Sequence, residues 1–189
     1  MIQNEKKIIL GFSGLLSSGK GTAAKYLEEK YGASTYRFST MLRDVLNRLY
    51  LEHTRDNLIK LSESIRSTFG EDTLAKTIAK DAETDPNPII VVEGIRRLAD
   101  ISHLQQLPNF ILVEIFADPK IRYERLIQRG ENTDDKTKTY EQFLADHQRS
   151  TELSILEVLQ HAQERINNNG DTLELQKQLD ALVKKYQTL

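Results

Sequence analysis

Short apolar segments alternate with helical segments along this 189-residue chain. Apolar runs at 7–12, 89–92 and 110–116 have the composition of strands buried on both faces. Two shorter strands are predicted at 34–38 and 165–167. Strands that alternate with helices form a parallel sheet covered by helices on both faces. The sequence therefore predicts an α/β fold, a three-layer sandwich around a five-stranded parallel sheet.

Helices are predicted between these strands, and glycines, prolines and capping residues set their ends. Gly32 ends the first helix, and Thr139 with Gln142 has the spacing of a capping box. Three helices within about 40–85 form an insertion after the second strand, and we expect one domain spanning 1–189. The predicted helices cover 20–30, 41–51, 55–68, 72–81, 96–107, 121–129 and, with a break, 140–162, and a last helix opens at Asp171.

Composition excludes several classes of function. With 26 basic and 28 acidic side chains, the chain lacks the broad positive field that binds nucleic-acid polymers or anionic membranes. The absence of cysteine excludes thiolate metal sites and thiol nucleophiles, and the four histidines have no partner at metal-ligand spacing. The apolar run Ile8–Phe12 is too short for a signal sequence or a membrane span. We expect a soluble cytoplasmic protein that binds small molecules.

The loop after the first strand has the spacing of a phosphate-binding loop, or P-loop. In such a loop, backbone N–H groups and the following helix N-terminus surround a polyphosphate, while the lysine reaches the β and γ groups. A buried strand before the loop and a helix after it disfavour the alternative of a Gly/Ser turn with a surface lysine. The predicted ATP-binding residues are Gly14, Leu15, Leu16, Ser17, Ser18, Gly19, Lys20, Gly21 and Thr22.

The residue after the P-loop lysine is unusual, because Gly21 stands where a Mg²⁺-binding hydroxyl is common and Thr22 follows one place later. The segment Gly19-Lys-Gly-Thr22 resembles the phosphate loops of nucleoside monophosphate kinases, the adenylate and cytidylate kinase group. This resemblance implies that the nucleotide and waters hold Mg²⁺, and that Thr22 contacts the α-phosphate. Dephospho-coenzyme A kinases, a neighbouring family, usually carry the hydroxyl directly after the lysine.

The resemblance extends to Ser39-Thr-Met-Leu-Arg43, which is similar to the Ser-Thr-Gly-Asp-Met-Leu-Arg stretch of adenylate kinases without its Gly-Asp pair. It implies that Ser39 and Arg43 bind the acceptor monophosphate. It also implies a short lid at about 129–140 that closes over the triphosphate and begins with the catalytic residues Arg125 and Arg129.

Further arginines lie on helix faces suited to phosphate binding. Arg55 and Arg66 share one face of the helix at 55–68, and we prefer Arg66 as an acceptor ligand over the alternative of a solvated surface. Another face of this helix is predicted to be buried and is formed by Leu58, Leu61, Ile65 and Phe69.

Arg122, Arg125 and Arg129 form one row that leads into a segment without apolar residues, 130–139. The alternative is an ordinary amphipathic helix in which acidic residues pair with these arginines. Arg149, beyond the predicted lid, is a weaker candidate.

Glu93 ends the third strand, where a carboxylate can hold Mg²⁺ through water, and the alternative is that it caps the following helix. Arg96, three residues later, is predicted to bind the acceptor phosphate. The first acid after the second strand, Asp44, lies well inside a helix, which favours a phosphate acceptor over a hydroxyl that needs a base. The alternative is that Glu93 serves as the base for a hydroxyl acceptor.

We therefore predict ATP-dependent phosphoryl transfer to a nucleoside or deoxynucleoside monophosphate, with Mg²⁺ as cofactor. A hydroxyl acceptor, dephospho-coenzyme A first, is the alternative among kinases. The second alternative is a switch that hydrolyses ATP or GTP slowly, although the chain has no Asn-Lys-x-Asp motif and no Asp-x-x-Gly after the third strand.

Overall fold

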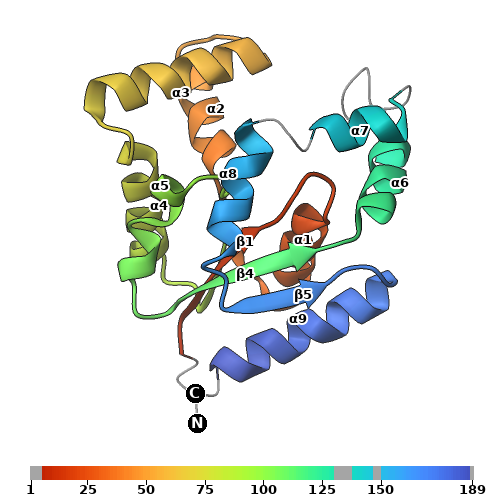
Figure 1. Ribbon diagram of the computed structural model, residues 1–189. Helices are drawn as coiled ribbons and strands as arrows, with labels where there is room; N and C mark the ends of the chain where they lie inside the picture. The colour runs from red at the N-terminus through yellow and green to blue at the C-terminus, as the bar shows by residue number, and fades with distance from the viewer. Residues whose placement is uncertain (1–5, 130–137, 147–149, 188–189) are drawn as a thin grey trace.

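The computed structural model describes residues 6–129, 138–146 and 150–187. Five parallel strands form one sheet in the order β2-β3-β1-β4-β5. Figure 1 shows β1, β4 and β5 of this sheet with the helices around them. The predicted α/β fold with a five-stranded parallel sheet is confirmed. The strands are β1 Ile8–Ser13, β2 Ser34–Arg37, β3 Ile89–Glu93, β4 Phe110–Phe116 and β5 Glu164–Asn167.

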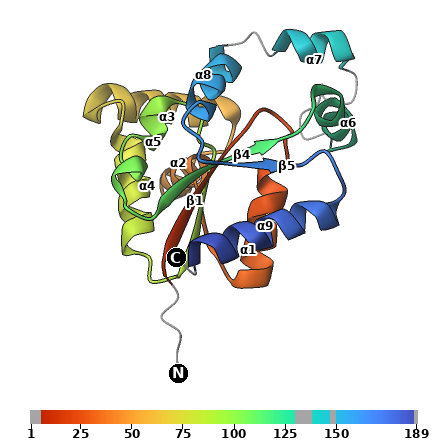
Figure 2. The same cartoon turned by 60° about the horizontal axis from the view of Figure 1, so that its bottom comes forward.

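Helices cover both faces of the sheet (Figure 2). Helices α1 and α9 lie side by side on one face, and α2, α4, α5 and α8 cover the other. The helices are α1 Lys20–Tyr31, α2 Phe38–Arg48, α3 Arg55–Phe69, α4 Thr73–Thr84, α5 Leu98–Ile101, α6 Pro119–Arg129, α7 Tyr140–Asp146, α8 Ser150–Leu159 and α9 Thr172–Gln187, with a short 3₁₀ turn η1 at Leu104–Gln106.

Alternation along each strand divides the core into two layers. In β1, Ile8, Leu10 and Phe12 pack toward α1 and α9, whereas Ile9 packs toward α2 and α4. All six residues of β1 and all five of β3 are buried, which explains why these segments read as continuous apolar runs. Because every strand points the same way, the carboxyl ends of all five meet at one edge of the sheet.

The helices between β2 and β3 differ in detail from the prediction. Helix α2 begins directly after β2, at Phe38 rather than at residue 41, because Phe38 and Leu42 already pack into the core. The predicted buried face of α3 is wrong at Phe69, which is 74% exposed. Arg66 is the buried residue at this end of the helix instead, at 8% exposure.

The predicted single helix at 96–107 is also wrong. Gly94 has a φ of +81°, and Arg97 is still extended, so helical geometry starts only at Leu98. The carboxylate of Asp100 accepts hydrogen bonds from the backbone N–H groups of Arg96 and Arg97, at 2.9 and 3.0 Å. This carboxylate stabilises a tight turn in place of the first helical turn, and only α5 and η1 follow.

Within the described residues, no helix combines the length and the apolar character needed to cross a membrane.

Candidate functional site

The P-loop connects β1 to α1 at the carboxyl edge of the sheet. Its lysine, Lys20, is the first residue of α1, and Nζ donates to the carbonyl oxygens of Gly14 at 2.5 Å and Leu15 at 3.2 Å. Gly19 has a φ of +99°, a conformation that side chains rarely adopt. The loop therefore curls around its own lysine, between a buried strand and a helix N-terminus as predicted.

Close packing also explains the two glycines that frame the loop. A Cβ atom on Gly14 would lie 2.4 Å from the carbonyl oxygen of Ile115 in β4. A Cβ atom on Gly19 would lie 2.1 Å from Nδ2 of Asn168, which follows β5. The loop is thus pressed against β4 and against the β5–α9 connection.

Asn168 is not among the predicted site residues, yet it holds the P-loop in place. The side chain is 5% exposed, and its Nδ2 donates to the carbonyl oxygen of Ser18 at 2.8 Å. Its backbone N–H donates to the carbonyl oxygen of Phe116 at 2.7 Å. The only signal in the sequence is its place at the end of a predicted strand, where a parallel sheet binds its ligands.

Arg122 braces the same loop from α6. The side chain is 2% exposed, and it donates from Nε to the carbonyl oxygen of Ala117 at 3.0 Å and from Nη1 to that of Leu16 at 3.2 Å. The guanidinium also lies over the ring of Phe143, 5.3 Å from its centroid. Arg122 therefore supports the loop from behind and differs in role from the next arginine of the row.

Arg125 lies one turn further along α6 and approaches the start of α1. Its Nη1 is buried and has no hydrogen-bond partner among the described residues. The same atom lies 4.0 Å from the position that a Cβ atom on Gly19 would take. Burial lowers the pKa of the Arg125 guanidinium, which nevertheless keeps its charge at neutral pH. A half-buried cation, with one buried nitrogen that has no partner among the described residues, thus faces the N-terminus of α1, the kind of place that suits an anion.

The predicted lid lies mostly outside the described residues, as do Arg149 and the side chain of Arg129. The helices on either side of it are held together. The hydroxyl of Tyr123 in α6 donates to the carbonyl oxygen of Lys138 at 2.9 Å, and its ring packs against Tyr140 and Phe143 of α7. The capping box predicted for Thr139 and Gln142 is confirmed, with reciprocal hydrogen bonds of 2.9 and 3.2 Å.

Glu93 faces the other side of the P-loop helix. The side chain of Arg37, the last residue of β2, donates from Nη2 to Oε1 of Glu93 at 2.7 Å. A Cβ atom on Gly21 would lie 3.8 Å from both Arg37 Nη2 and Glu93 Oε2. Arg37 is not among the predicted site residues, because the sequence alone does not reveal that β2 and β3 are neighbours with these two residues in register.

A single buried carboxylate beside a P-loop suits Mg²⁺, which keeps several waters and takes few protein ligands. Within the described residues, no group of three or more acidic or histidine side chains gathers to hold a metal ion. Glu93 thus fits a contact to Mg²⁺ through water, with the nucleotide supplying phosphate oxygens.

The predicted acceptor residues fall on the α2–α5 side of the loop (Figure 1). Arg43 donates from Nη1 to Oγ of Ser39 at 2.8 Å, within the first turns of α2. Arg66 donates to Oδ1 of Asp100 at 3.3 Å and to the carbonyl oxygen of Glu71. Arg96 has an exposed side chain, and its backbone is tied to the same Asp100. Asp100 thus joins the segments that carry two of the three predicted acceptor arginines.

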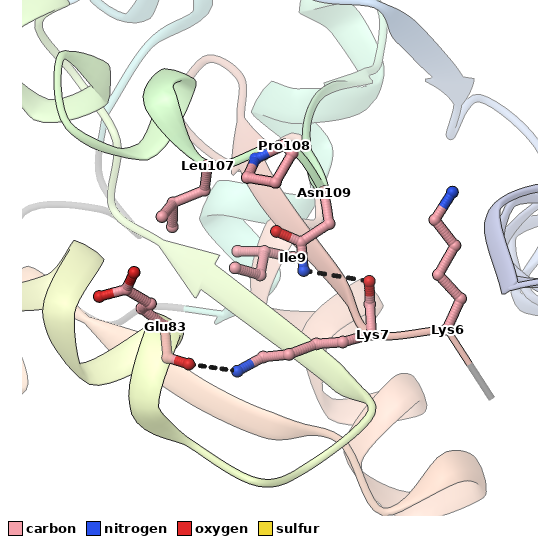
Figure 3. A pocket seen from close by; sticks show the side chains of 7 residues that line it. All are labelled: Lys6, Lys7, Ile9, Glu83, Leu107, Pro108 and Asn109. Carbon is pink, nitrogen blue, oxygen red and sulfur yellow. Dashed lines mark hydrogen bonds between the residues drawn. The ribbon is translucent and has the colours of Figure 1, made fainter. Parts of the chain in front are cut away.

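A separate hollow of about 510 Å³ lies at the opposite edge of the sheet (Figure 3). Hydrogen bonds from Lys7 to the carbonyl oxygen of Glu83 and from Asn109 to that of Lys7 link residues that line it. Because ligands of parallel sheets bind at the carboxyl ends of the strands, we place the candidate site at the P-loop. The residues that line this hollow are Lys6, Lys7, Ile9, Glu83, Leu107, Pro108 and Asn109.

Comparison with known proteins agrees with this geometry. Residues 13–143 match a family model described as an AAA domain, which spans more than two thirds of the chain. The chain belongs to the AAA domain family. The matched segment begins at the last residue of β1 and includes the P-loop, the helical insertion, Glu93 and α6. The resemblance to a P-loop kinase-like family is thereby confirmed.

Relatives of similar length align with this AAA domain protein over most of the chain. A UPF0200 protein from Sulfurisphaera tokodaii is 28% identical over 177 residues, which are 94% of this chain and 96% of the relative. A UPF0200 protein from Thermococcus gammatolerans is 25% identical over 183 residues, with 94% and 95% covered.

Solved structures show the same fold at lower identity. TT1252 from Thermus thermophilus superposes with a TM-score of 0.61 and 18% identity, over 96% of this chain and 98% of that one. Shikimate kinase from Acinetobacter baumannii, in complex with shikimate, superposes with a TM-score of 0.55 and 16% identity, with 96% of each chain covered. The AAA domain of this chain thus has a P-loop kinase-like fold.

Proposed function

We propose that this protein is an ATP-dependent phosphotransferase that converts a nucleoside or deoxynucleoside monophosphate into the diphosphate. The observation that carries the proposal is Arg125, whose buried Nη1 has no partner among the described residues and faces the P-loop at Gly19. A buried guanidinium nitrogen without a hydrogen-bond partner is costly, and an anion at the loop would satisfy it. A triphosphate held by Lys20 and the loop amides provides that anion.

The residues around the loop would divide the work of phosphoryl transfer. Lys20 and the loop N–H groups bind the β and γ phosphates, and Thr22 contacts the α-phosphate. Arg125 and Arg129 neutralise charge on the group in flight. An oxygen of the acceptor phosphate attacks the γ phosphorus, and the bond between this phosphorus and the β–γ bridging oxygen of ATP breaks, which leaves ADP. Mg²⁺, when bound with ATP and contacted by Glu93 through water, supplies further charge neutralisation.

The acceptor would bind on the α2–α5 side of the loop. Arg43, together with Ser39, and the exposed Arg96 are proposed to contact the acceptor phosphate. Arg66 shares a buried ion pair with Asp100, at 3.3 Å, and all three of its guanidinium nitrogens donate to described residues. It would therefore reach the acceptor phosphate only through its remaining N–H groups, while Asp100 orients it. An acceptor that is already anionic needs these cations rather than a general base.

An ADP-release assay over a panel of nucleoside and deoxynucleoside monophosphates tests the proposal. We expect at least one monophosphate to stimulate ADP release well above the rate with ATP alone. Lys20→Ala should abolish this stimulation, and Arg125→Lys should lower kcat by about 10²-fold, since the ammonium does not reproduce the planar guanidinium. Lys25→Ala removes an exposed cation of the same helix and is the matched control, with unchanged kcat.

Two outcomes would overturn the proposal. If dephospho-coenzyme A or shikimate stimulates ADP release and no monophosphate does, the acceptor is a hydroxyl. If the protein binds ATP tightly and hydrolyses it without any dependence on acceptor, it acts as a nucleotide-dependent switch.

A further inference from the structure

Arg37 is a cation at the carboxyl edge of the sheet that the roles above leave without a function. We propose that Arg37 is an acceptor ligand: its guanidinium binds the anionic nucleophile of the acceptor, and Glu93 positions it. This inference rests on the proposed function and deepens it, because it makes an anionic nucleophile, rather than an alcohol, the group that the site selects.

The strand register brings Arg37 and Glu93 together. Each is the last residue of its strand, and they are paired Cα partners in the parallel β2–β3 ladder. Side chains alternate along a strand, so Glu93 points to the same face as Val91, which packs toward α1. Both side chains therefore extend from the sheet edge toward the first turn of α1, where the P-loop presents its phosphate site.

The side chain of Arg37 lies beside two glycines, Gly94 and Gly21. Gly94 has a φ of +81°, and a Cβ atom there would lie 3.6 Å from Cγ of Arg37, so the stem of Arg37 runs along this glycine. A Cβ atom on Gly21 would lie 3.8 Å from Nη2, so the guanidinium lies within van der Waals reach of the first turn of α1. The guanidinium thus lies next to the helix turn that binds phosphate, on the side from which an acceptor held by α2 would approach.

Arg37 and Glu93 differ in exposure, and this difference indicates a separate role for each. The side chain of Glu93 is 10% exposed, whereas that of Arg37 is 46% exposed. Arg37 makes one side-chain hydrogen bond to a described residue, through Nη2 to Glu93 at 2.7 Å. The other donors of its planar guanidinium have no hydrogen-bond partner among the described residues, and nearly half of the side chain is exposed. Glu93 therefore orients the guanidinium, and its outward donors suit a phosphate.

Charge also decides the class of nucleophile. A cation beside the γ-phosphate stabilises an incoming phosphate oxygen and removes the repulsion between two anions. An alcohol would need a base at this place, and the nearest described carboxylate already accepts a hydrogen bond from Arg37. The geometry at the ends of β2 and β3 thus favours an acceptor whose nucleophile is a phosphate.

Steady-state kinetics on the monophosphate that the panel identifies test the role of Arg37. Arg37→Gln should raise the acceptor KM by about 10-fold to 100-fold, the range expected for loss of a charged hydrogen bond, and leave the KM for ATP within about twofold. Arg37→Lys keeps the charge and loses the planar guanidinium, so its acceptor KM should lie between those of the wild type and of Arg37→Gln. Lys25→Gln also breaks an ion pair of the chain, with Glu29, and should change neither constant.

A merely structural role for Arg37 makes a different prediction, which binding of the same monophosphate by calorimetry without nucleotide or Mg²⁺ detects. If Arg37 only neutralises Glu93, the double variant Arg37→Gln/Glu93→Gln should recover wild-type acceptor affinity, since no unpaired carboxylate remains. If Arg37 binds the acceptor, the double variant should stay as weak as Arg37→Gln, and Glu93→Gln alone should retain most of the affinity.

The outcomes separate the two proposals. Wild-type turnover with an unchanged acceptor KM in Arg37→Gln, or recovered affinity in the double variant, would overturn the role of Arg37 and leave the proposed function standing. Absence of turnover and of binding for every monophosphate would overturn both.

Discussion

Gly19→Ala is the sharpest structural test of how the P-loop is held. The added Cβ atom would meet Nδ2 of Asn168 at 2.1 Å, and the backbone φ of +99° is unfavourable for alanine. Asn168 is buried and its hydrogen bond to Ser18 is part of the loop's support, so the side chain must move and this hydrogen bond breaks. The variant therefore combines a backbone cost with a steric one.

The magnitudes follow from these two costs. A positive φ costs a non-glycine residue about 1–2 kcal/mol. Loss of the Asn168 hydrogen bond, with a buried carbonyl left unpaired, adds about 1–3 kcal/mol. We expect Gly19→Ala to lower the free energy of unfolding by about 3 kcal/mol, which for a chain of this size lowers Tm by about 6–12 °C.

Urea unfolding of two further variants separates the costs. Gly32→Ala is the matched control: Gly32 has a φ of +65° at the end of α1, and a Cβ atom there would meet nothing within 4 Å. It should cost only the backbone part, about 1–2 kcal/mol. In the background of Asn168→Ala, which removes the clashing amide, Gly19→Ala should likewise cost only that part.

Gly19→Ala, Asn168→Ala and the double variant form a double-mutant cycle that can refute this reasoning. Equal costs of Gly19→Ala with and without Asn168, or a loss below about 0.5 kcal/mol in the single variant, would refute the contact between the loop and the β5–α9 connection.

Two further predictions concern stability. Arg122→Met should lower the free energy of unfolding by about 1–3 kcal/mol, because the carbonyl groups of Ala117 and Leu16 lose their buried donor. Urea unfolding measures this change, and an unchanged free energy of unfolding would contradict the supporting role of Arg122. Asp180 accepts hydrogen bonds from Lys30, Tyr31 and Tyr26; although burial raises the pKa of this carboxyl, these bonds hold it below its ordinary value. A depressed carboxyl pKa stabilises the fold above the unfolded value of about 3.9 and ceases to do so as pH falls through the folded value. Asp180→Asn should therefore cost about 1 kcal/mol near neutral pH, and this cost should shrink as the pH falls below the unfolded value of about 3.9. A cost in urea unfolding that stays constant as the pH is lowered would contradict this.

The strands and the P-loop could be predicted because their signals are local. An apolar run such as 89–92 is buried on both faces wherever it lies in the sheet, and the loop glycines are needed for the backbone itself. The helix after β3 could not be predicted, because the carboxylate of Asp100 stabilises a turn there and also pairs with Arg66 from α3. The ion pair between Asp100 and Arg66 joins residues that are 34 positions apart in the sequence, so local patterns do not reveal it.

The missed site residues share a physical cause. Arg37 faces Glu93 only because β2 and β3 are neighbours in the sheet, although helices α2, α3 and α4 separate them along the chain. Asn168 meets the P-loop only because the end of β5 comes back to it, 150 residues after Ser18. Periodicity and capping describe neighbours in sequence, so neither pairing leaves a signal that they can detect.

Arginines of one helical row in α6 have different contacts, and we expect them to have different roles. Arg122 and Arg125 are three residues apart and both turn toward the P-loop, but the first is satisfied by two carbonyl oxygens and an aromatic ring. Arg125 has a buried nitrogen with no such partner among the described residues. Because a cation that is already satisfied gains little from an incoming anion, removal of Arg122 should reduce stability more than phosphoryl transfer. For Arg125 the order should be reversed, since its unmet hydrogen bond is completed only when a phosphate group arrives.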